Sequence, residues 1–279
     1  MSIQLIATDM DDTLLDGQGR ITPRTIQALS RAREAGARIV LCSGRMVKSM
    51  LPSAHALDLN EYMIAYNGAA VYDMAAQRVI NAIPVEADAA RALCRLAEEQ
   101  GAHVQAYGPD GYMFERNNPF SELYRAHVGI PGRATGRPLS DCLNYQPYKL
   151  LIIDSPERIQ YLLGLFRARF GEQVNCATSR ADFLELTAPK ADKGAALAAL
   201  CSRLGVPRSA VCAFGDGLND MTMLAFAAMG FAMANAHEQV RRAARHIAPP
   251  NTEEGVAQVV ERLLAQGQIA RAPHKEATE

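Results

Sequence analysis

Four short, mostly apolar runs, each followed by polar residues, lie near the two ends of the chain, at 5–7, 38–42, 211–214 and 230–233. Runs of this kind are typical of strands that are buried on both faces of a parallel sheet. The stretches between and after them favour helices, at 22–35, 192–204, 220–227 and 254–265. Thr22 can cap the first helix and Pro23 suits its first position. Both ends of the chain therefore predict an α/β domain with a parallel sheet.

Between about residues 84 and 190 the pattern changes to helices separated by paired strands. Helices are expected at 87–100 and 156–170, and strands at 103–107, 111–114, 148–153, 174–178 and 183–187. Gly108-Pro109-Asp110 marks a turn between the first two of these strands. The chain is thus predicted to hold an α/β domain in two parts, 1–83 and 191–265, with an α+β insertion at 84–190. The polar stretch 266–279 is expected to be a disordered tail.

Composition removes several classes of protein. Of 279 residues, 49% are hydrophobic and 21% charged, as in an ordinary globular protein, and the formal net charge of −1 lacks the positive field that nucleic acid or an anionic membrane attracts. The six cysteines form no CxxC pair, which argues against a zinc ribbon or a thioredoxin-type site. The chain start has no basic n-region, and no apolar run approaches about 18 residues. We therefore expect a cytoplasmic protein. A monomer or homodimer is expected as well, although composition does not decide between the two.

Two polar clusters directly follow the first two predicted strands, at the edge where open α/β sheets bind ligands. Asp9, Asp11 and Thr13 form a DxDxT pattern after the first strand. An aspartate-rich turn is the alternative interpretation. Ser43-Gly44-Arg45 follows the second strand, and a hydroxyl beside exposed backbone amides can hold phosphate oxygens. This triplet is also typical of ordinary turns.

A third cluster, Gly215-Asp216-Gly217-Leu218-Asn219-Asp220, lies between the strand at 211–214 and the next helix. Alone, it could be a turn followed by an aspartate N-cap. Lys193, at the start of the preceding helix, could alone be a solvated lysine. The sequence contains neither GxGxxG, the dinucleotide-binding motif, nor GxxxxGK[ST], the P-loop motif. Neither of these motifs therefore offers another interpretation of the chain.

The order of the four features is far more specific than any one of them. DxDxT, SGR, a Lys-Gly helix start and GDxxND in this order resemble the haloacid dehalogenase superfamily, and within it the Cof-type (subfamily IIB) phosphatases with an inserted C2-type α+β cap. The resemblance covers about residues 3–265. It implies a Rossmann-like core with a cap, and hydrolysis of small phosphorylated metabolites, such as sugar phosphates or phosphorylated cofactors. Asp12 and Ser43 stand where many relatives have Gly and Thr, and both changes keep the turn and the hydroxyl.

The resemblance gives Asp9 the role of nucleophile, which would form an aspartyl-phosphate, and makes Asp11 the general acid and base. Asp216, Asp220, Asp9 and the backbone carbonyl of Asp11 would hold Mg²⁺. Simple electrostatics supports a cation here, because a phosphate dianion must approach carboxylates. Two unit charges 4 Å apart repel by about 4 kcal/mol at an effective dielectric constant of 20.

The resemblance makes Ser43, Gly44, Lys193 and Asn219 the phosphate-binding residues. Lys193 would neutralise the nucleophile and the phosphoryl oxygens, while Asn219 would touch phosphate or Lys193. Arg45 is expected near the site without a settled role.

Four polar residues on predicted cap strands are candidates for selecting the leaving group: Tyr107, Tyr112, Lys149 and Glu185. The alternative is that they are ordinary exposed strand residues. Asp11 argues against a dehalogenase or a transport ATPase, because these relatives lack an acid at that position. A phosphomutase needs the same acid and stays open, as does a regulatory binding module that keeps the fold with little turnover.

Overall fold

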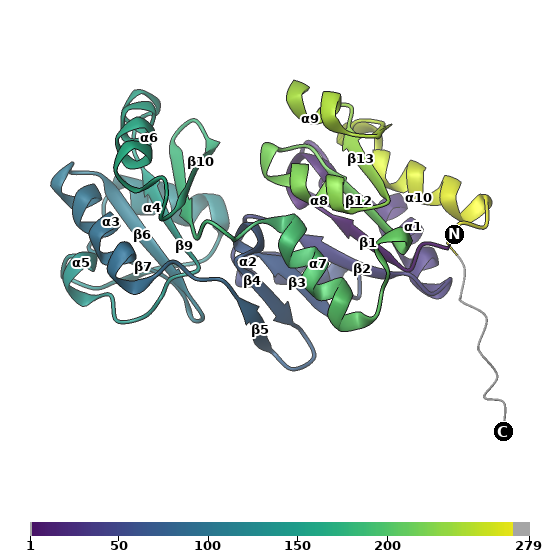
Figure 1. Cartoon of the computed structure of the whole chain (residues 1–279), viewed down its shortest axis with the longest axis horizontal. Helices are drawn as coiled ribbons and strands as arrows, with labels where there is room; N and C mark the ends of the chain where they lie inside the picture. The colour runs from purple at the N-terminus through teal and green to yellow at the C-terminus, as the bar shows by residue number, and fades with distance from the viewer. Residues whose placement is uncertain (1, 270–279) are drawn as a thin grey trace.

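The computed structural model describes residues 2–269, which form two lobes lying side by side (Figure 1). Both ends of the chain build one lobe, called the core lobe below, and the middle of the chain builds the other, called the cap. The expected class, a Rossmann-like α/β domain with an α+β insertion, is confirmed.

The core lobe is built on one eight-stranded sheet in the order β14-β13-β12-β1-β2-β3-β4-β5. Its strands are β1 (Leu5–Thr8), β2 (Arg38–Cys42), β3 (Tyr62–Ala65), β4 (Ala70–Asp73), β5 (Arg78–Ala82), β12 (Val211–Gly215), β13 (Met229–Met233) and β14 (His246–Ala248). The strands from β14 to β3 pair in parallel, and β4 and β5 add an antiparallel edge. The carboxyl ends of β1, β2, β3 and β12 therefore lie at one edge.

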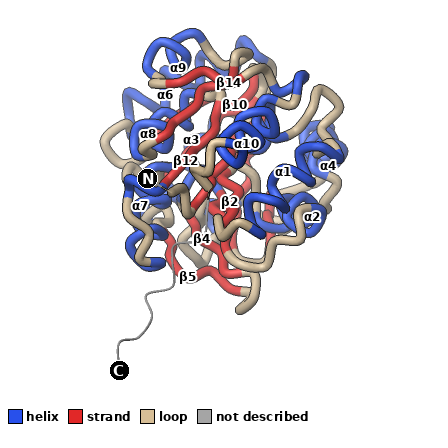
Figure 2. The backbone as a smooth tube through the Cα atoms, turned by 90° about the vertical axis from the view of Figure 1, so that its right-hand side faces the viewer, coloured by secondary structure: helices blue, strands red, loops and turns tan. Residues whose placement is uncertain are grey.

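Helices cover both faces of this sheet, with α1 and α10 on one side and α7 and α8 on the other (Figure 2). The helices of this lobe are α1 (Pro23–Glu34), α2 (Val47–Ala56), α7 (Lys193–Leu204), α8 (Met221–Phe226), α9 (Glu238–Ala243) and α10 (Gly255–Ala265). Thr22 caps α1 by accepting a hydrogen bond from the Thr25 N–H, as its sequence predicts.

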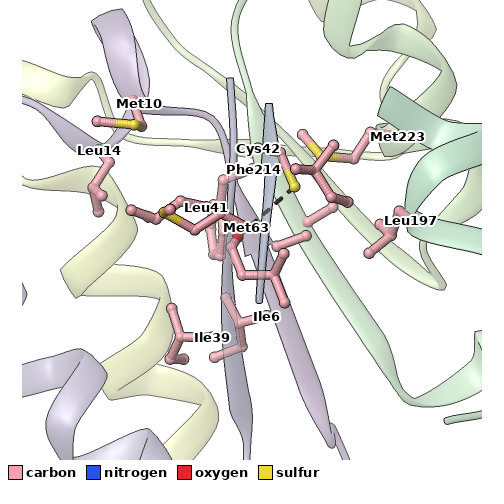
Figure 3. Close-up of a cluster of buried hydrophobic side chains, with 14 of the residues drawn as sticks. Ile6, Met10, Leu14, Ile39, Leu41, Cys42, Met63, Leu197, Phe214 and Met223 are labelled. Atoms are coloured by element: carbon pink, nitrogen blue, oxygen red, sulfur yellow. Dashed lines mark hydrogen bonds between the residues drawn. The ribbon is translucent and has the colours of Figure 1, made fainter. Parts of the chain in front are cut away.

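Side chains from the central strands alternate between the two helical layers (Figure 3). Cys42 and Phe214 point toward α7 and α8, where Leu197 and Met223 lie, and Leu41 points to the opposite layer. All of these side chains are buried. Burying both faces of the strands fixes the positions of their ends, where the polar clusters lie.

A close backbone contact ties the turn after β3 to the start of α7. Gly68 has φ +95°, and a Cβ there would lie 2.2 Å from the carbonyl oxygen of Asp192. Any side chain at this position would therefore force the two segments apart. Asp192 is also the N-cap of α7, so this contact fixes where Lys193 begins the helix.

The cap holds a six-stranded sheet in the order β10-β11-β9-β6-β7-β8. Its strands are β6 (His103–Gly108), β7 (Gly111–Phe114), β8 (Arg133–Ala134), β9 (Lys149–Ile153), β10 (Asn175–Arg180) and β11 (Phe183–Thr187). Its helices are α3 (Ala87–Glu99), α4 (Pro119–Val128), α5 (Leu139–Cys142) and α6 (Pro156–Phe170). The expected cap strands and the two long expected helices are all present.

Alternation along the cap strands gives the cap sheet two different faces. Leu150 and Ile152 of β9 belong to a hydrophobic cluster with α3 and α6, whereas Leu151 and Ile153 belong to the cluster that includes the core lobe. Lys149 is two residues before Leu151, so its side chain lies on the same face, toward the core lobe. The same period places Tyr107, Tyr112 and Glu185 on that face.

Several elements were not predicted from the sequence, and the β3–β4–β5 hairpins are the most important of them. β3 holds a short buried apolar run, Tyr62–Ala65, that was overlooked, whereas β5 lies at the edge of the sheet and is mostly exposed. The expected helix at 220–227 is a 3₁₀ turn, Leu218–Asp220, followed by the shorter α8.

The start of the expected tail is packed against the core lobe. Ile269 is buried, and the Gln268 carbonyl oxygen accepts a hydrogen bond from the Ile3 N–H. The rest of that tail, 270–279, lies outside the described residues. None of the helices within residues 2–269 is long and apolar enough to cross a membrane.

We expect His103 to make the stability of the cap depend on pH. Its side chain is buried, and burial lowers the pKa of His103 from 6.5 to about 4. Because the folded-state pKa lies below the unfolded one, the unfolded chain binds more protons between these values. Stability should therefore be complete above about pH 6.5 and fall by about 3 kcal/mol as the pH drops toward 4.

Urea unfolding at pH 7 and pH 5 tests this prediction. His103→Gln should flatten the loss of stability between the two pH values, whereas exposed His55→Gln should not. An unchanged pH dependence in His103→Gln would contradict the assignment of this loss to His103.

Candidate active site

The polar clusters predicted from the sequence meet at the carboxyl edge of the core sheet. β1 pairs with both β12 and β2, with Thr8 beside Phe214 and Leu41. The Asp9 N–H continues this pairing by donating to the Phe214 carbonyl oxygen at 3.0 Å. The turns after β1, β2, β3 and β12 are therefore brought together, as expected for a ligand site in an open α/β sheet.

A buried ion cluster lies at the centre of this edge. Lys193 Nζ donates to Asp9 Oδ1 and to Asp220 Oδ1, each at 2.6 Å. Lys193 and Asp220 are completely buried, and Asp9 is 7% exposed. Burial opposes the charge on Lys193, but the carboxylates of Asp220 and Asp9 outweigh it and raise the pKa of Lys193. The ammonium therefore stays protonated between the two carboxylates.

Hydrogen bonds fix the loop that carries Asp216. The second oxygen of Asp220 accepts from the backbone N–H groups of Asp216 and Gly217, at 3.0 and 2.9 Å. The hydroxyl of Thr13 donates to Asp216 Oδ1 at 2.6 Å. Asp220 therefore does not cap α8 with its side chain, which was the alternative interpretation of this motif. It joins Lys193 to the loop instead.

Asp9, Asp216 and Asp220 fit a divalent cation. Each offers an oxygen within 4.8 Å of the other two, and within residues 2–269 they form the one such group of possible metal ligands. Burial raises the pKa of Asp9, with Asp220 and Asp216 adding to it and Lys193 opposing it. Burial also raises the pKa of Asp216 to about 6, although the Thr13 hydrogen bond opposes it. The site thus has more negative charge than one ammonium balances, and hard oxygen donors suit Mg²⁺.

Asp11 lies outside that group of carboxylates. Its side chain is 55% exposed and accepts hydrogen bonds from Arg45 Nε, at 2.8 Å, and from Arg45 Nη2. Arg45, whose role the sequence left unsettled, is thus placed beside the predicted general acid. Asp12 follows with φ +55°, which turns the chain sharply between Asp11 and Thr13.

Ser43 and Gly44 form a tight turn after β2. Ser43 is buried, and its Oγ accepts a hydrogen bond from the Arg45 N–H at 3.1 Å. A Cβ at Gly44 would lie 2.8 Å from Asn67 Oδ1, so a larger residue here would push the Asn67 amide out of place. The turn after β2 is therefore packed against the turn after β3.

Asn219 donates from Nδ2 to Asn67 Oδ1 at 2.9 Å, a partner that the sequence analysis did not name. Asn67 itself was missed. The available signal was Asn67-Gly68, a turn dipeptide that follows the apolar run of β3 at the same sheet edge. Because β3 itself was not predicted, this turn was not recognised as part of the site.

The four candidate selector residues of the cap divide into two pairs. The hydroxyl of Tyr107 donates to Gln105 and that of Tyr112 to the Ile130 carbonyl, so both bond within the cap. Lys149 and Glu185 instead reach the core lobe, where Lys149 Nζ donates to the Gly44 carbonyl at 2.9 Å. All four are buried, not exposed as the alternative interpretation had it.

Comparison with known proteins places this chain in a family. A family model described as haloacid dehalogenase-like hydrolase matches residues 6–260. The pyridoxal phosphate phosphatase YbhA of Escherichia coli (strain K12) is 29% identical over 271 residues, covering 93% of this chain and 98% of that protein. A crystal structure of a haloacid dehalogenase-like hydrolase from Bacteroides thetaiotaomicron has 29% identity and a TM-score of 0.86, covering 94% and 100% of the two chains.

A crystal structure of TM0651 from Thermotoga maritima is similar to the same extent, with 30% identity and a TM-score of 0.84 over 93% of this chain and 97% of that one. The chain therefore belongs to the haloacid dehalogenase-like hydrolases. Within that family it is a Cof-type phosphatase, which is a phosphoric monoester hydrolase. The resemblance inferred from the four motifs is confirmed.

Proposed function

We propose that this phosphatase depends on Mg²⁺ and hydrolyses small phosphorylated metabolites through an aspartyl-phosphate at Asp9. The observation that supports this most strongly is the buried contact of Asp9 with Lys193 beside Asp216 and Asp220. A carboxylate nucleophile must meet a phosphate dianion of the same sign, and positive charge at this point removes that barrier.

In the first step an oxygen of Asp9 attacks phosphorus and the bond to the leaving oxygen breaks. Asp11 gives that oxygen its proton, so that an alcohol leaves. In the second step water attacks the same phosphorus atom, Asp11 takes a proton from the water, and inorganic phosphate and the Asp9 carboxylate are regenerated. This division replaces one of the slowest uncatalysed reactions by two easier ones.

Asp9, Asp216, Asp220 and the backbone carbonyl of Asp11 would hold Mg²⁺, which when bound supplies positive charge for the phosphoryl oxygens. Thr13 keeps Asp216 oriented toward this position through its 2.6 Å hydrogen bond. The residues around the ion thus have their orientations fixed by the fold before substrate arrives.

Ser43 and Gly44 would bind the phosphoryl group, together with Lys193 and Asn219. Ser43 and Gly44 follow β2, and Asn219 belongs to the turn after β12, so the two turns would approach the phosphate from opposite sides. Arg45 would hold the carboxylate of Asp11 near the leaving oxygen by its two hydrogen bonds.

The core lobe, 1–83 and 191–265, would carry out the chemistry while the cap, 84–190, covers it. The relative YbhA is named for pyridoxal phosphate, which makes phosphorylated cofactors, with sugar phosphates, the first compounds to test.

Phosphate release from sugar phosphates, nucleotides and pyridoxal phosphate tests the proposal. With Mg²⁺ we expect release from one or a few of these compounds, loss of release in EDTA, and recovery when Mg²⁺ is restored. Release that persists in EDTA would contradict the metal assignment. No release from any compound by the folded, Mg²⁺-loaded protein would contradict the proposed substrates.

A further inference from the structure

Two charged side chains of the cap are buried against the core lobe. Lys149 of β9 and Glu185 of β11 are 3% and 8% exposed, and Lys149 Nζ lies 3.0 Å from Glu185 Oε1. They lie side by side because β9 and β11 are neighbouring strands and both residues point toward the core lobe. Charges buried this deeply are costly unless further hydrogen bonds satisfy them.

The core lobe supplies the hydrogen bonds that complete this pair. Lys149 Nζ donates to the carbonyl oxygen of Gly44 at 2.9 Å. Asn67 Nδ2 donates to Glu185 Oε2 at 2.6 Å, while Ser179 of the cap donates to Oε1. Both contacts across the lobes thus end on the turns that follow β2 and β3.

Asn67 extends the contact into the third motif. Its Oδ1 accepts from Asn219 Nδ2 at 2.9 Å, and its own N–H donates to the Ser43 carbonyl at 3.0 Å. The amide donors of Asn219 and Asn67 therefore point in one direction, toward the Glu185 carboxylate. Hydrogen bonds in such a chain polarise and strengthen one another.

We propose that Asn67 is a positioning residue that couples closure of the cap to the phosphate-binding turns. This rests on the proposed role of Ser43, Gly44 and Asn219 in holding phosphate. When the cap closes, Lys149 and Glu185 fix the Gly44 carbonyl and the Asn67 amide, and Asn67 then fixes the amide of Asn219. When the cap opens, the Gly44 carbonyl and the Asn67 amide lose their partners in the cap, and Asn219 keeps only Asn67, whose side chain is then no longer held by Glu185.

Asn67→Asp is the most direct test, because it keeps the size of the side chain and its positive φ of 56°. It replaces the amide donor by a carboxylate oxygen facing Glu185, so the two should repel. We expect the radius of gyration from small-angle X-ray scattering to rise as the cap opens. We also expect kcat/KM to fall by about 10- to 100-fold, the effect of losing one hydrogen bond to a charged group.

Adding Glu185→Gln to Asn67→Asp should restore the contact with donor and acceptor exchanged. The net charge of the pocket then equals that of the natural protein, and we expect both the radius of gyration and kcat/KM to recover in large part. A residue with a merely structural role would show no such recovery. Glu172→Gln, an exposed change elsewhere in the cap, is the control and should alter neither quantity.

A second variant tests the proposal without leaving an unpaired buried charge that could unfold the cap. Lys149→Met combined with Glu185→Leu removes both charges together, which buried ion pairs tolerate far better than loss of one partner. It should keep the cap folded and still raise the radius of gyration. A closed shape and unchanged kcat/KM in Asn67→Asp, or no recovery in the double exchange, would overturn the proposal. The radius of gyration can be measured without any enzymatic activity. If the natural protein were inactive, that result would contradict the proposed function, and the scattering data would still test the coupling.

Discussion

Asp9→Asn is expected to lower phosphate release by at least about 10⁴-fold while leaving the protein folded. The amide is a poor nucleophile and cannot form the acyl phosphate, so both chemical steps lose their covalent route. The shape of the side chain is unchanged, and its remaining oxygen can still accept the hydrogen bond from Lys193. Lys193 also keeps its ion pair with Asp220, so the buried ammonium is not left alone.

The measurement is the initial rate of phosphate release with Mg²⁺, together with the circular dichroism spectrum and the thermal midpoint. Asp12→Asn is a matched control from the same turn, since Asp12 is exposed and asparagine tolerates its positive φ. The control should retain activity within a few-fold. Turnover near the natural rate in folded Asp9→Asn would rule out the covalent route.

Lys193→Met is expected to lower the free energy of unfolding by about 3–5 kcal/mol, the usual effect of removing one partner from a buried ion pair. It would leave the carboxylates of Asp9 and Asp220 facing each other without an ammonium between them. Activity should fall by about 10²- to 10³-fold as well, because positive charge at the phosphoryl group is lost.

Thermal and urea unfolding measure the first effect, and phosphate release measures the second. Exposed Lys190→Met, three residues earlier in the chain, should change neither by much. Adding Asp220→Asn to Lys193→Met removes one of the two opposed charges, so it should recover part of the stability and none of the activity. An unchanged thermal midpoint in Lys193→Met would contradict the electrostatic role of this residue.

The sequence was most informative where strands are buried on both faces. β1, β2 and β12 are continuous apolar runs, so their ends, and with them Asp9, Ser43 and Asp216, could be placed at one edge of the sheet. The order of the motifs then indicated the family. Lys193 could be recognised only within that order, because a lysine at a helix start is ordinary by itself.

Sequence analysis missed Asn67 and the contacts that Lys149 and Glu185 make, because these depend on distant parts of the chain. Asn67 follows β3, which was not predicted although it is apolar, and its amide hydrogen-bonds to Glu185 across 118 positions of sequence. Lys149 meets Gly44 across 105 positions. Such contacts leave no local pattern, because they depend on how the cap docks on the core lobe. Arg45 was recognised as nearby, but its pairing with Asp11 needed the turn at Asp12.

The central claim is that phosphate passes through the carboxylate of Asp9, and trapping that intermediate tests it most directly. The protein would be mixed with a substrate found in the phosphate-release panel and Mg²⁺, quenched in acid during turnover, reduced with borohydride and analysed by peptide mass spectrometry. Borohydride converts an aspartyl-phosphate to homoserine, so the account predicts homoserine at position 9, dependent on substrate and absent in Asp9→Asn. Steady turnover with aspartate unmodified at position 9, or with the modification on another residue, would contradict it.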